Sequence, residues 1–308
     1  LYATAGHAQS TWPTKPVTMV VPFPAGGGTD AFARPLAAQF ARLSGKSLVI
    51  DNRGGAGGTL GAGIAAKAAP DGYTFFMGAV HHAIAPSMYP KLDYNIETDF
   101  VPVGLISSVP QVIVVNPQRV AATNLKDLLE FVRKNPAKLN YGSAGNGTSH
   151  HLAGELFKLQ TKTFITHIPY RGAGPALQDL IAGQVDMMFD GLGSSAAHIK
   201  GGRIRALAVT SEQREPSMPQ LPTVGDTVPG YEASAWFGVA APKGTPAAAI
   251  AKLNREINAA FNDPTMRAKL ADLGGVPIPG TPDQFWAIHR METEKWAKIV
   301  QFSGAKAE

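Results

Sequence analysis

The chain has 308 residues, of which 44% are hydrophobic and 17% are charged, and its formal net charge is +5. A single hydrophobic core stops growing at about 250–300 residues, so we expect two cores of ordinary size. The chain holds no cysteine, which excludes disulfides, thiolate nucleophiles and cysteine-based metal sites. Lysine and arginine are dispersed without a basic run, which argues against nucleic acid as a partner. No apolar stretch approaches the ~20 residues of a membrane-spanning helix.

The first ten residues, LYATAGHAQS, have two readings. Small residues ending at Ala8 fit the tail of a cleaved secretory signal. The other reading is a remnant of an expression vector.

Strand-like runs alternate with helical periodicity in the first half of the chain. In the first helix, the apolar residues Phe32, Leu36, Phe40 and Leu43 are expected on one face. Such alternation predicts a parallel α/β sheet. The expected order is strand 17–21, helix 30–43, strand 47–50, helix to 69, strand 73–77 and strand 111–115.

A second α/β series begins after Asn116-Pro117. The expected order is helix 125–134, strand 139–141, helix 149–159, strand 163–168, helix 174–182, strand 185–189, strand 206–209, loop 215–229, strand 235–240 and helices 247–262, 264–273 and 282–303. The helical tail has no sheet of its own, so we expect it to pack on the first series. The prediction is therefore two lobes, 12–115 with 236–308 and 116–235, with a hinge and a cleft between them.

Two glycine loops each join a strand to a helix. The first is PFPAGGGTD at 22–30, and the second is YGSAGNGTSHH at 141–151. Glycine lets backbone approach a ligand, and a helix N-terminus offers free N–H donors and the positive end of its dipole. Thr29 and Thr148 are candidate N-caps. One loop from each lobe would form a pincer for an anionic group.

Other side chains are candidates for the rest of a pocket. Arg171 could bind a carboxylate through two N–H groups, and Tyr170 could offer its ring and hydroxyl. Asp190 ends a strand, where it could accept from a ligand ammonium or hydroxyl or could tie down a loop. His81 follows a strand and could face the ligand, while Trp236 either lines the cleft or belongs to the core.

Two alternatives remain open. Gly26, Gly28 and Ala31 fit a dinucleotide-binding loop, with Asp51 about 20 residues on, which would indicate an NAD-dependent oxidoreductase. Against it, Asp30 puts a negative charge where a pyrophosphate would lie. The second alternative is a metal site built from the histidine pairs 81–82 and 150–151. No G-x-S-x-G or H-E-x-x-H motif is present, so we expect no catalytic residues, no cofactor and no metal.

Taken together, the chain resembles the substrate-binding proteins of tripartite tricarboxylate transporters, the Bug or TctC family. The resemblance spans residue 12 to the end and rests on PFPAGGGTD at 22–30, DNRGGAGG at 51–58, PDGYT at 70–74, YGSAGNGTSHHLAGELF at 141–157, PYRGAGPALQDLIAGQVDMMFD at 169–190 and LPTV at 221–224.

The resemblance implies a type II periplasmic binding protein fold, α/β in class, with two α/β lobes that close on ligand. It also implies a periplasmic, non-enzymatic protein, expected here as a monomer, that delivers a small carboxylate to membrane permease subunits. Asp190 favours an acidic amino acid slightly over a plain di- or tricarboxylate. One carboxylate is expected between the two loops, partly through ordered waters. The residues implied for the ligand site are Phe23, Ala25, Thr29, Asp30, Ala79, His81, Ser143, Gly147, Thr148, Tyr170, Arg171, Gly172 and Asp190.

Asp30 complicates this site, because its carboxylate would repel a bound anion. Intervening water would relieve the repulsion. Alternatively, Asp30 holds its own loop by accepting from backbone N–H groups.

Overall fold

The computed structural model describes residues 12–307, so both readings of the first ten residues lie outside the described range. Within that range the strands form one mixed sheet in the order β2-β1-β3-β9-β4-β7-β5-β6, and β8 and β10 also pair with β4. The strands are β1 (Val17–Val21), β2 (Leu48–Asn52), β3 (Thr74–Ala79), β4 (Phe100–Val115), β5 (Asn140–Ser143), β6 (Thr166–Pro169), β7 (Met187–Gly191), β8 (Arg205–Val209), β9 (Ser234–Pro242) and β10 (Val276–Pro277).

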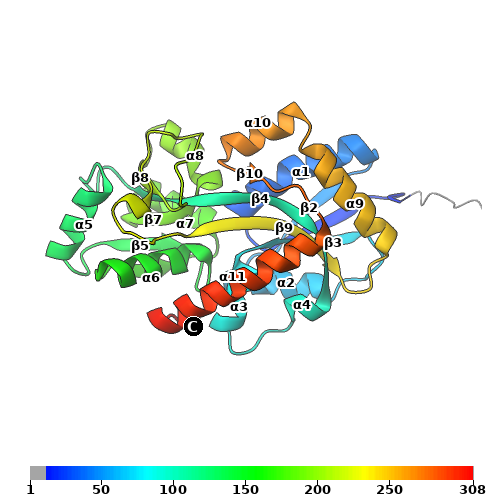
Figure 1. The fold of residues 1–308 in the computed structure, drawn as a ribbon, viewed down its shortest axis with the longest axis horizontal. Helices are drawn as coiled ribbons and strands as arrows, with labels where there is room; N and C mark the ends of the chain where they lie inside the picture. The colour runs from blue at the N-terminus through cyan, green and yellow to red at the C-terminus, as the bar shows by residue number, and fades with distance from the viewer. Residues whose placement is uncertain (1–11, 308) are drawn as a thin grey trace, which may run out of the picture.

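The helices pack around this sheet, and Figure 1 shows them in two groups joined by long strands. They are α1 (Gly28–Ser44), η1 (Ala56–Gly58), α2 (Thr59–Ala66), α3 (His81–Met88), α4 (Ile96–Asp99), α5 (Leu125–Lys134), α6 (Ser149–Thr161), α7 (Ala173–Ile181), α8 (Leu192–Lys200), η2 (Val224–Asp226), α9 (Ala247–Ala260), α10 (Pro264–Asp272) and α11 (Pro282–Ser303). None of these helices has the length and apolar character needed to cross a bilayer.

Strand β4 connects the two halves of the sheet. Its first part pairs with β9, from Phe100 opposite Pro242 to Pro110 opposite Ser234. Its last part, from Gln111 onward, pairs with β7 and β8 instead. The sequence predicted only this last part as strand. The remainder was missed because prolines discourage a strand assignment, whereas here a register shift follows Pro102.

Helix α1 shows how a glycine loop becomes a helix start. Gly27 is the N-cap, Asp30 lies in the first turn, and Gly45 ends the helix in the left-handed conformation. The buried stripe contains Phe32, Leu36 and Phe40, as the periodicity predicted, but Leu43 near the end of the helix is 41% exposed and does not belong to it. The predicted capping role of Thr29 is wrong, because Thr29 is the second residue of the helix.

The helical tail packs on more than one part of the molecule. Helices α9 and α10 contact α1, and α9 also covers β4. Helix α11 contacts α3 and β4, but it also reaches α6, which belongs to the other group of helices in Figure 1. The tail therefore does more than cover the first group, because its last helix touches both.

Candidate functional site

Several helices point their N-termini at one inner cavity of about 20 Å³. Its lining includes residues at or within the first turns of α1, α3, α6, α7 and α8. The first N–H groups of a helix have no partner within the helix, and the helix dipole places partial positive charge there. An anionic group bound in this cavity would therefore lie at the positive ends of these helices. The lining residues are Phe23, Gly27, Gly28, Thr29, Phe32, His81, Val109, Ala144, His150, Ala173, Gly191, Gly193, Ala235 and Phe237.

A second cavity of about 220 Å³ adjoins the first and shares Phe23 and Ala144 with it. Its other lining residues are Gly55, Ala56, Gly57, Gly58, Tyr89, Gly145, Asn146, Pro169, Tyr170 and Arg171. Phe23 and Ala144 also share a small apolar cluster with Ala173. These side chains therefore form the boundary between an inner and an outer compartment.

Loops from the two halves touch across the cleft. The Tyr89 hydroxyl donates to the Asn146 carbonyl oxygen at 2.8 Å. Gly57 has φ +61°, and a Cβ added there would lie 2.5 Å from the same oxygen. A Cβ on Gly172 would lie 2.8 Å from Cδ of Pro24. The structure is thus closed over the cavities, and glycine is needed where the backbones meet.

The first loop is held by Asp30. Its Oδ2 accepts from the Gly26 N–H at 3.0 Å and from Arg34 Nε at 2.8 Å. Its Oδ1 accepts from Arg34 Nη2 at 2.9 Å and from Asn52 Nδ2 at 3.1 Å. Burial acts to raise the pKa of this carboxyl, but the hydrogen bonds from Arg34, Gly26 and Asn52 outweigh it, and the pKa is lowered. Asp30 therefore holds its own loop, the second of the two roles considered from sequence.

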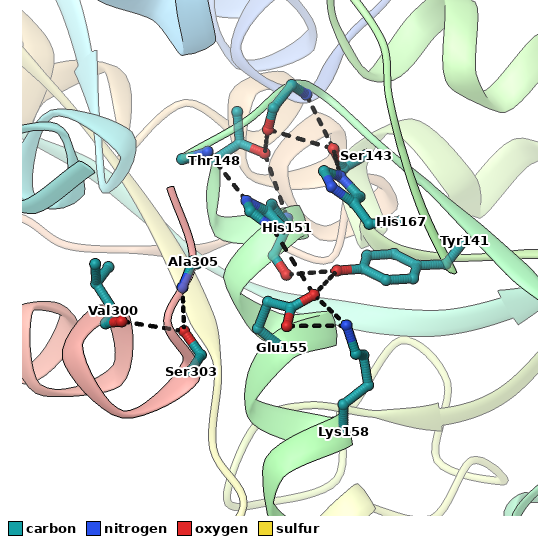
Figure 2. A network of polar contacts seen from close by, with 12 residues as sticks. Tyr141, Ser143, Thr148, His151, Glu155, Lys158, His167, Val300, Ser303 and Ala305 are labelled. Atoms are coloured by element: carbon teal, nitrogen blue, oxygen red, sulfur yellow. Dashed lines mark hydrogen bonds and ion pairs between the residues drawn. The ribbon is translucent and has the colours of Figure 1, made fainter. Parts of the chain in front are cut away.

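The second loop is held by two histidines, and Figure 2 shows them beside it. Ser143 Oγ lies 2.6 Å from His167 Nε2 and accepts from the Gly145 N–H at 3.1 Å. The Gly147 N–H donates to His151 Nδ1 at 3.2 Å. His151, in the first turn of α6, therefore supports the second loop.

Thr148 is the N-cap of α6, as predicted. Its Oγ1 donates to the Gly145 carbonyl oxygen at 2.7 Å and accepts from the His151 N–H at 3.4 Å. The hydroxyl is thus engaged within the loop.

A polar network continues from His151 along α6 (Figure 2). Glu155 Oε1 accepts from the Tyr141 hydroxyl at 2.7 Å and from Lys158 Nζ at 2.7 Å. Burial, together with the Glu155 charge, raises the pKa of Tyr141 well above its usual value. The phenol therefore stays protonated and remains a donor, which fixes β5 against α6.

His81 and His150 both line the inner cavity, and their ring centroids are 5.9 Å apart. Burial lowers the pKa of both, most strongly for His81, so both imidazoles are neutral near pH 7. Ser149 Oγ lies 3.3 Å from His81 Nε2. One histidine from each pair does meet across the cleft, as the metal alternative requires. However, residues 12–307 contain no group of three or more side chains able to hold a metal.

The predicted site residues separate into three groups. Those lining the inner cavity are Phe23, Thr29 and His81, and those lining the outer one are Phe23, Tyr170 and Arg171. The others lie within the loops or at strand ends without lining either cavity: Ala25, Asp30, Ala79, Ser143, Gly147, Thr148, Gly172 and Asp190. The Ala79 N–H, for example, donates to His82 Nδ1 at 3.0 Å.

Part of the cavity lining was not predicted from the sequence. Phe237 lines the inner cavity, whereas its neighbour Trp236 packs against Phe285 with ring centroids 5.6 Å apart. Gly191 and Gly193 were missed because α8 was not predicted. The start of that helix after β7 is the signal that could have identified them.

The helices form two groups, long strands pass between the groups, and glycine loops precede helix N-termini at the cavities. These features define a two-lobed solute-binding protein. Residues 32–304 match the family described as "Tripartite tricarboxylate transporter family receptor". The protein BugT of Bordetella pertussis is 38% identical over 311 residues, which cover 99% of this chain and 95% of BugT. The chain belongs to the TctC family of tripartite tricarboxylate transporter receptors, which includes the Bug proteins.

Solved structures agree with this assignment. The structure of R. palustris Rpa4515 with adipate has a TM-score of 0.93 and 38% identity, covering 96% of this chain and 100% of that one. MatC from Rhodopseudomonas palustris with bound malate has a TM-score of 0.88 and 34% identity, covering 94% and 100%. The fold is thus the predicted two-lobed periplasmic binding protein fold. The family comprises binding receptors, not enzymes, which counts against the oxidoreductase alternative.

Proposed function

We propose that this protein captures a small carboxylate in the periplasm and delivers it to the membrane permease subunits of a tripartite tricarboxylate transporter. The observation that carries the proposal is the convergence of helix N-termini on the inner cavity. Backbone donors and helix dipoles can hold a carboxylate without a cationic side chain. The related structures with adipate and malate support the same ligand class.

In this proposal the carboxylate lies between the first turns of α1 and α7. Gly28 and Thr29 face it from one lobe, and Ala173 faces it from the other. Asp30 does not contact the ligand, because its oxygens are engaged by Gly26, Arg34 and Asn52. The repulsion anticipated from the sequence is thereby reduced.

Arg171 lines the outer cavity, where its guanidinium can attract a second anionic group or the entering ligand. Phe23 separates the two compartments and would contact the ligand's carbon chain. In this arrangement backbone donors line the inner cavity, Phe23 forms an apolar boundary, and Arg171 places a cation at the outer cavity. It needs no cofactor and no catalytic group.

The lobes in this proposal keep the boundaries 12–115 with 236–308 and 116–235. Their relative movement would open the cleft, since Tyr89 and Asn146 come from different lobes. The protein is proposed to act as a monomer. Light scattering of the purified protein checks that state, and a stable dimer would contradict it.

Thermal-shift screening tests the ligand class directly. The panel contains di- and tricarboxylates, acidic amino acids and aromatic acids, each paired with its neutral amide as a control. Stabilisation by at least one acid and by no matching amide is expected, because only the ionised form exploits the helix N-termini. The absence of stabilisation by any carboxylate at millimolar concentration contradicts the proposal. Mass spectrometry of ligand released from the purified protein then identifies the natural occupant.

A further inference from the structure

The carboxylate of Asp190 has one oxygen with a structural role and one without. Asp190 is fully buried at the end of β7. Its Oδ2 accepts from the hydroxyls of Ser194 and Ser195, each at 2.6 Å, which fixes the first turn of α8. Its Oδ1 is buried without a hydrogen-bond partner. Anchoring of α8 therefore accounts for Oδ2 of Asp190 but not for the buried Oδ1.

His150 lies beside the unpartnered oxygen. Its Nδ1 lies 3.6 Å from Asp190 Oδ1 and is itself buried without a partner. The ring lines the inner cavity, and burial keeps it neutral. A neighbouring carboxylate favours the tautomer that carries its proton on the facing nitrogen. In that tautomer Nε2 of His150 is unprotonated and is left as a hydrogen-bond acceptor.

The lining of the inner cavity can therefore offer both donors and an acceptor. The helix N-termini offer donors, whereas His150 offers an acceptor with a buried carboxylate behind it. A hydrogen bond contributes about 0.5–1.5 kcal/mol net, so a ligand that donates one to Nε2 of His150 gains over a ligand that does not. A ligand hydroxyl or ammonium supplies an O–H or N–H there, and a methylene cannot.

We infer that His150, positioned by Asp190, selects carboxylates that carry a hydroxyl or amino substituent over the same acids without one. This inference rests on the proposed function and specifies its substrate class. His150 touches the substituent, and Asp190 is a positioning residue that acts through His150. Among residues 12–307, His150 is the one basic side chain within 4.0 Å of the Asp190 carboxylate, and burial keeps it neutral. A ligand ammonium therefore also gains from charge complementarity.

Calorimetric titration with matched ligand series tests the inference. The series are succinate, malate and aspartate, then glutarate, 2-hydroxyglutarate and glutamate, then propionate, lactate and alanine. Within at least one series, a hydroxy or amino acid is expected to bind about tenfold or more tightly than its plain partner, a difference of ~1.4 kcal/mol. The hydroxy and amino members show which donor the pocket takes.

Three variants locate the preference. His150→Phe keeps a ring but removes both nitrogens, and we expect it to reduce the affinity ratio to about threefold or less. Asp190→Asn removes the charge and should lower the preference for the amino acid more than that for the hydroxy acid. Ser195→Ala is the matched control, because it removes one donor to Oδ2 and leaves Oδ1 and His150 in place. It should lower the melting temperature and preserve the ratio.

The ratio of two affinities in one variant does not depend on how stable that variant is, so partial destabilisation leaves the test valid. The inference is overturned if no substituted acid binds more tightly than its plain partner, or if His150→Phe keeps the ratio. Binding of plain acids in that case would leave the proposed function standing. Failure of every carboxylate to bind would overturn both.

Discussion

The imidazole rings of His151 and His167 stack with their centroids 4.0 Å apart and an interplanar angle of 6°. His167 contacts Ser143 and His151 accepts from Gly147, so the pair supports the second glycine loop at two points. Burial is the main cause that lowers the pKa of His151 to about 4 and that of His167 to about 3. Both rings are therefore neutral when the loop has this shape.

The first prediction concerns acid stability. Each histidine titrates near 6.5 when the chain is unfolded, above its value in the folded protein. As the pH falls below 6.5, the unfolded state takes up protons that the folded state refuses, so the free energy of unfolding must fall. For His151 alone the loss between pH 6.5 and about 4 is ~3 kcal/mol, to order of magnitude.

Urea unfolding at a series of pH values measures this loss. The His167→Gln variant should show a shallower decline than the wild type, because one proton-uptake site is removed. A free energy of unfolding that stays constant from pH 6.5 down to 4 would contradict the assignment of buried neutral histidines.

Local signals in the sequence were enough to predict the strand–loop–helix units. The run 17–21, the glycines after it and the periodicity of Phe32, Leu36 and Phe40 are all local, and they recur as β1 and α1. Helix α8 was missed because its Gly193 and Ser194 read as loop residues, and packing against β4 and β7 overrides that propensity.

The site was less predictable because it depends on contacts between distant residues. Trp236 and Phe237 are adjacent on β9, so their side chains point to opposite faces, and only the register of the sheet decides which one faces the cavity. Both oxygens of Asp30 are taken by partners such as Arg34 and Asn52, a geometry that no motif encodes. Contacts across the cleft, such as Tyr89 with Asn146, have no local sequence signal at all.

The second prediction concerns closure. Gly57→Ala places a Cβ 2.5 Å from the Asn146 carbonyl oxygen and 2.6 Å from the Tyr89 hydroxyl, so the closed form is disfavoured. The apparent affinity for ligand should fall about tenfold or more, in proportion to the loss of the closed population. Gly202→Ala is the matched control: its φ is +68°, and nothing lies within 4 Å of the added Cβ. Calorimetry should show wild-type affinity for the control, and equal losses in the two variants would contradict the closure argument.

The third prediction concerns the first glycine loop. Asp30→Asn replaces an acceptor oxygen by an NH₂ group that would face the donors of Gly26, Arg34 or Asn52. Loss of these buried hydrogen bonds should cost ~1–3 kcal/mol of stability and weaken ligand binding, because the α1 N-terminus is released. Arg34→Met should cost less, about 0–1 kcal/mol, because Arg34 is 56% exposed. Urea unfolding ranks the two variants, and a larger loss for Arg34→Met would contradict the role assigned to Asp30.

The last prediction compares two phenols that donate hydrogen bonds of equal length. The Tyr141 hydroxyl donates to Glu155 at 2.7 Å, and the Tyr170 hydroxyl donates to Asp179 at 2.7 Å. Tyr141 is fully buried and Tyr170 is only partly buried. Tyr141→Phe leaves Glu155 short of a donor where water cannot easily replace it, so it should cost ~1–3 kcal/mol. Tyr170→Phe should cost less, because water can satisfy Asp179. Urea unfolding of both variants without ligand measures the difference, and equal losses would mean that burial of the Tyr141–Glu155 pair adds nothing to the stability of the second lobe.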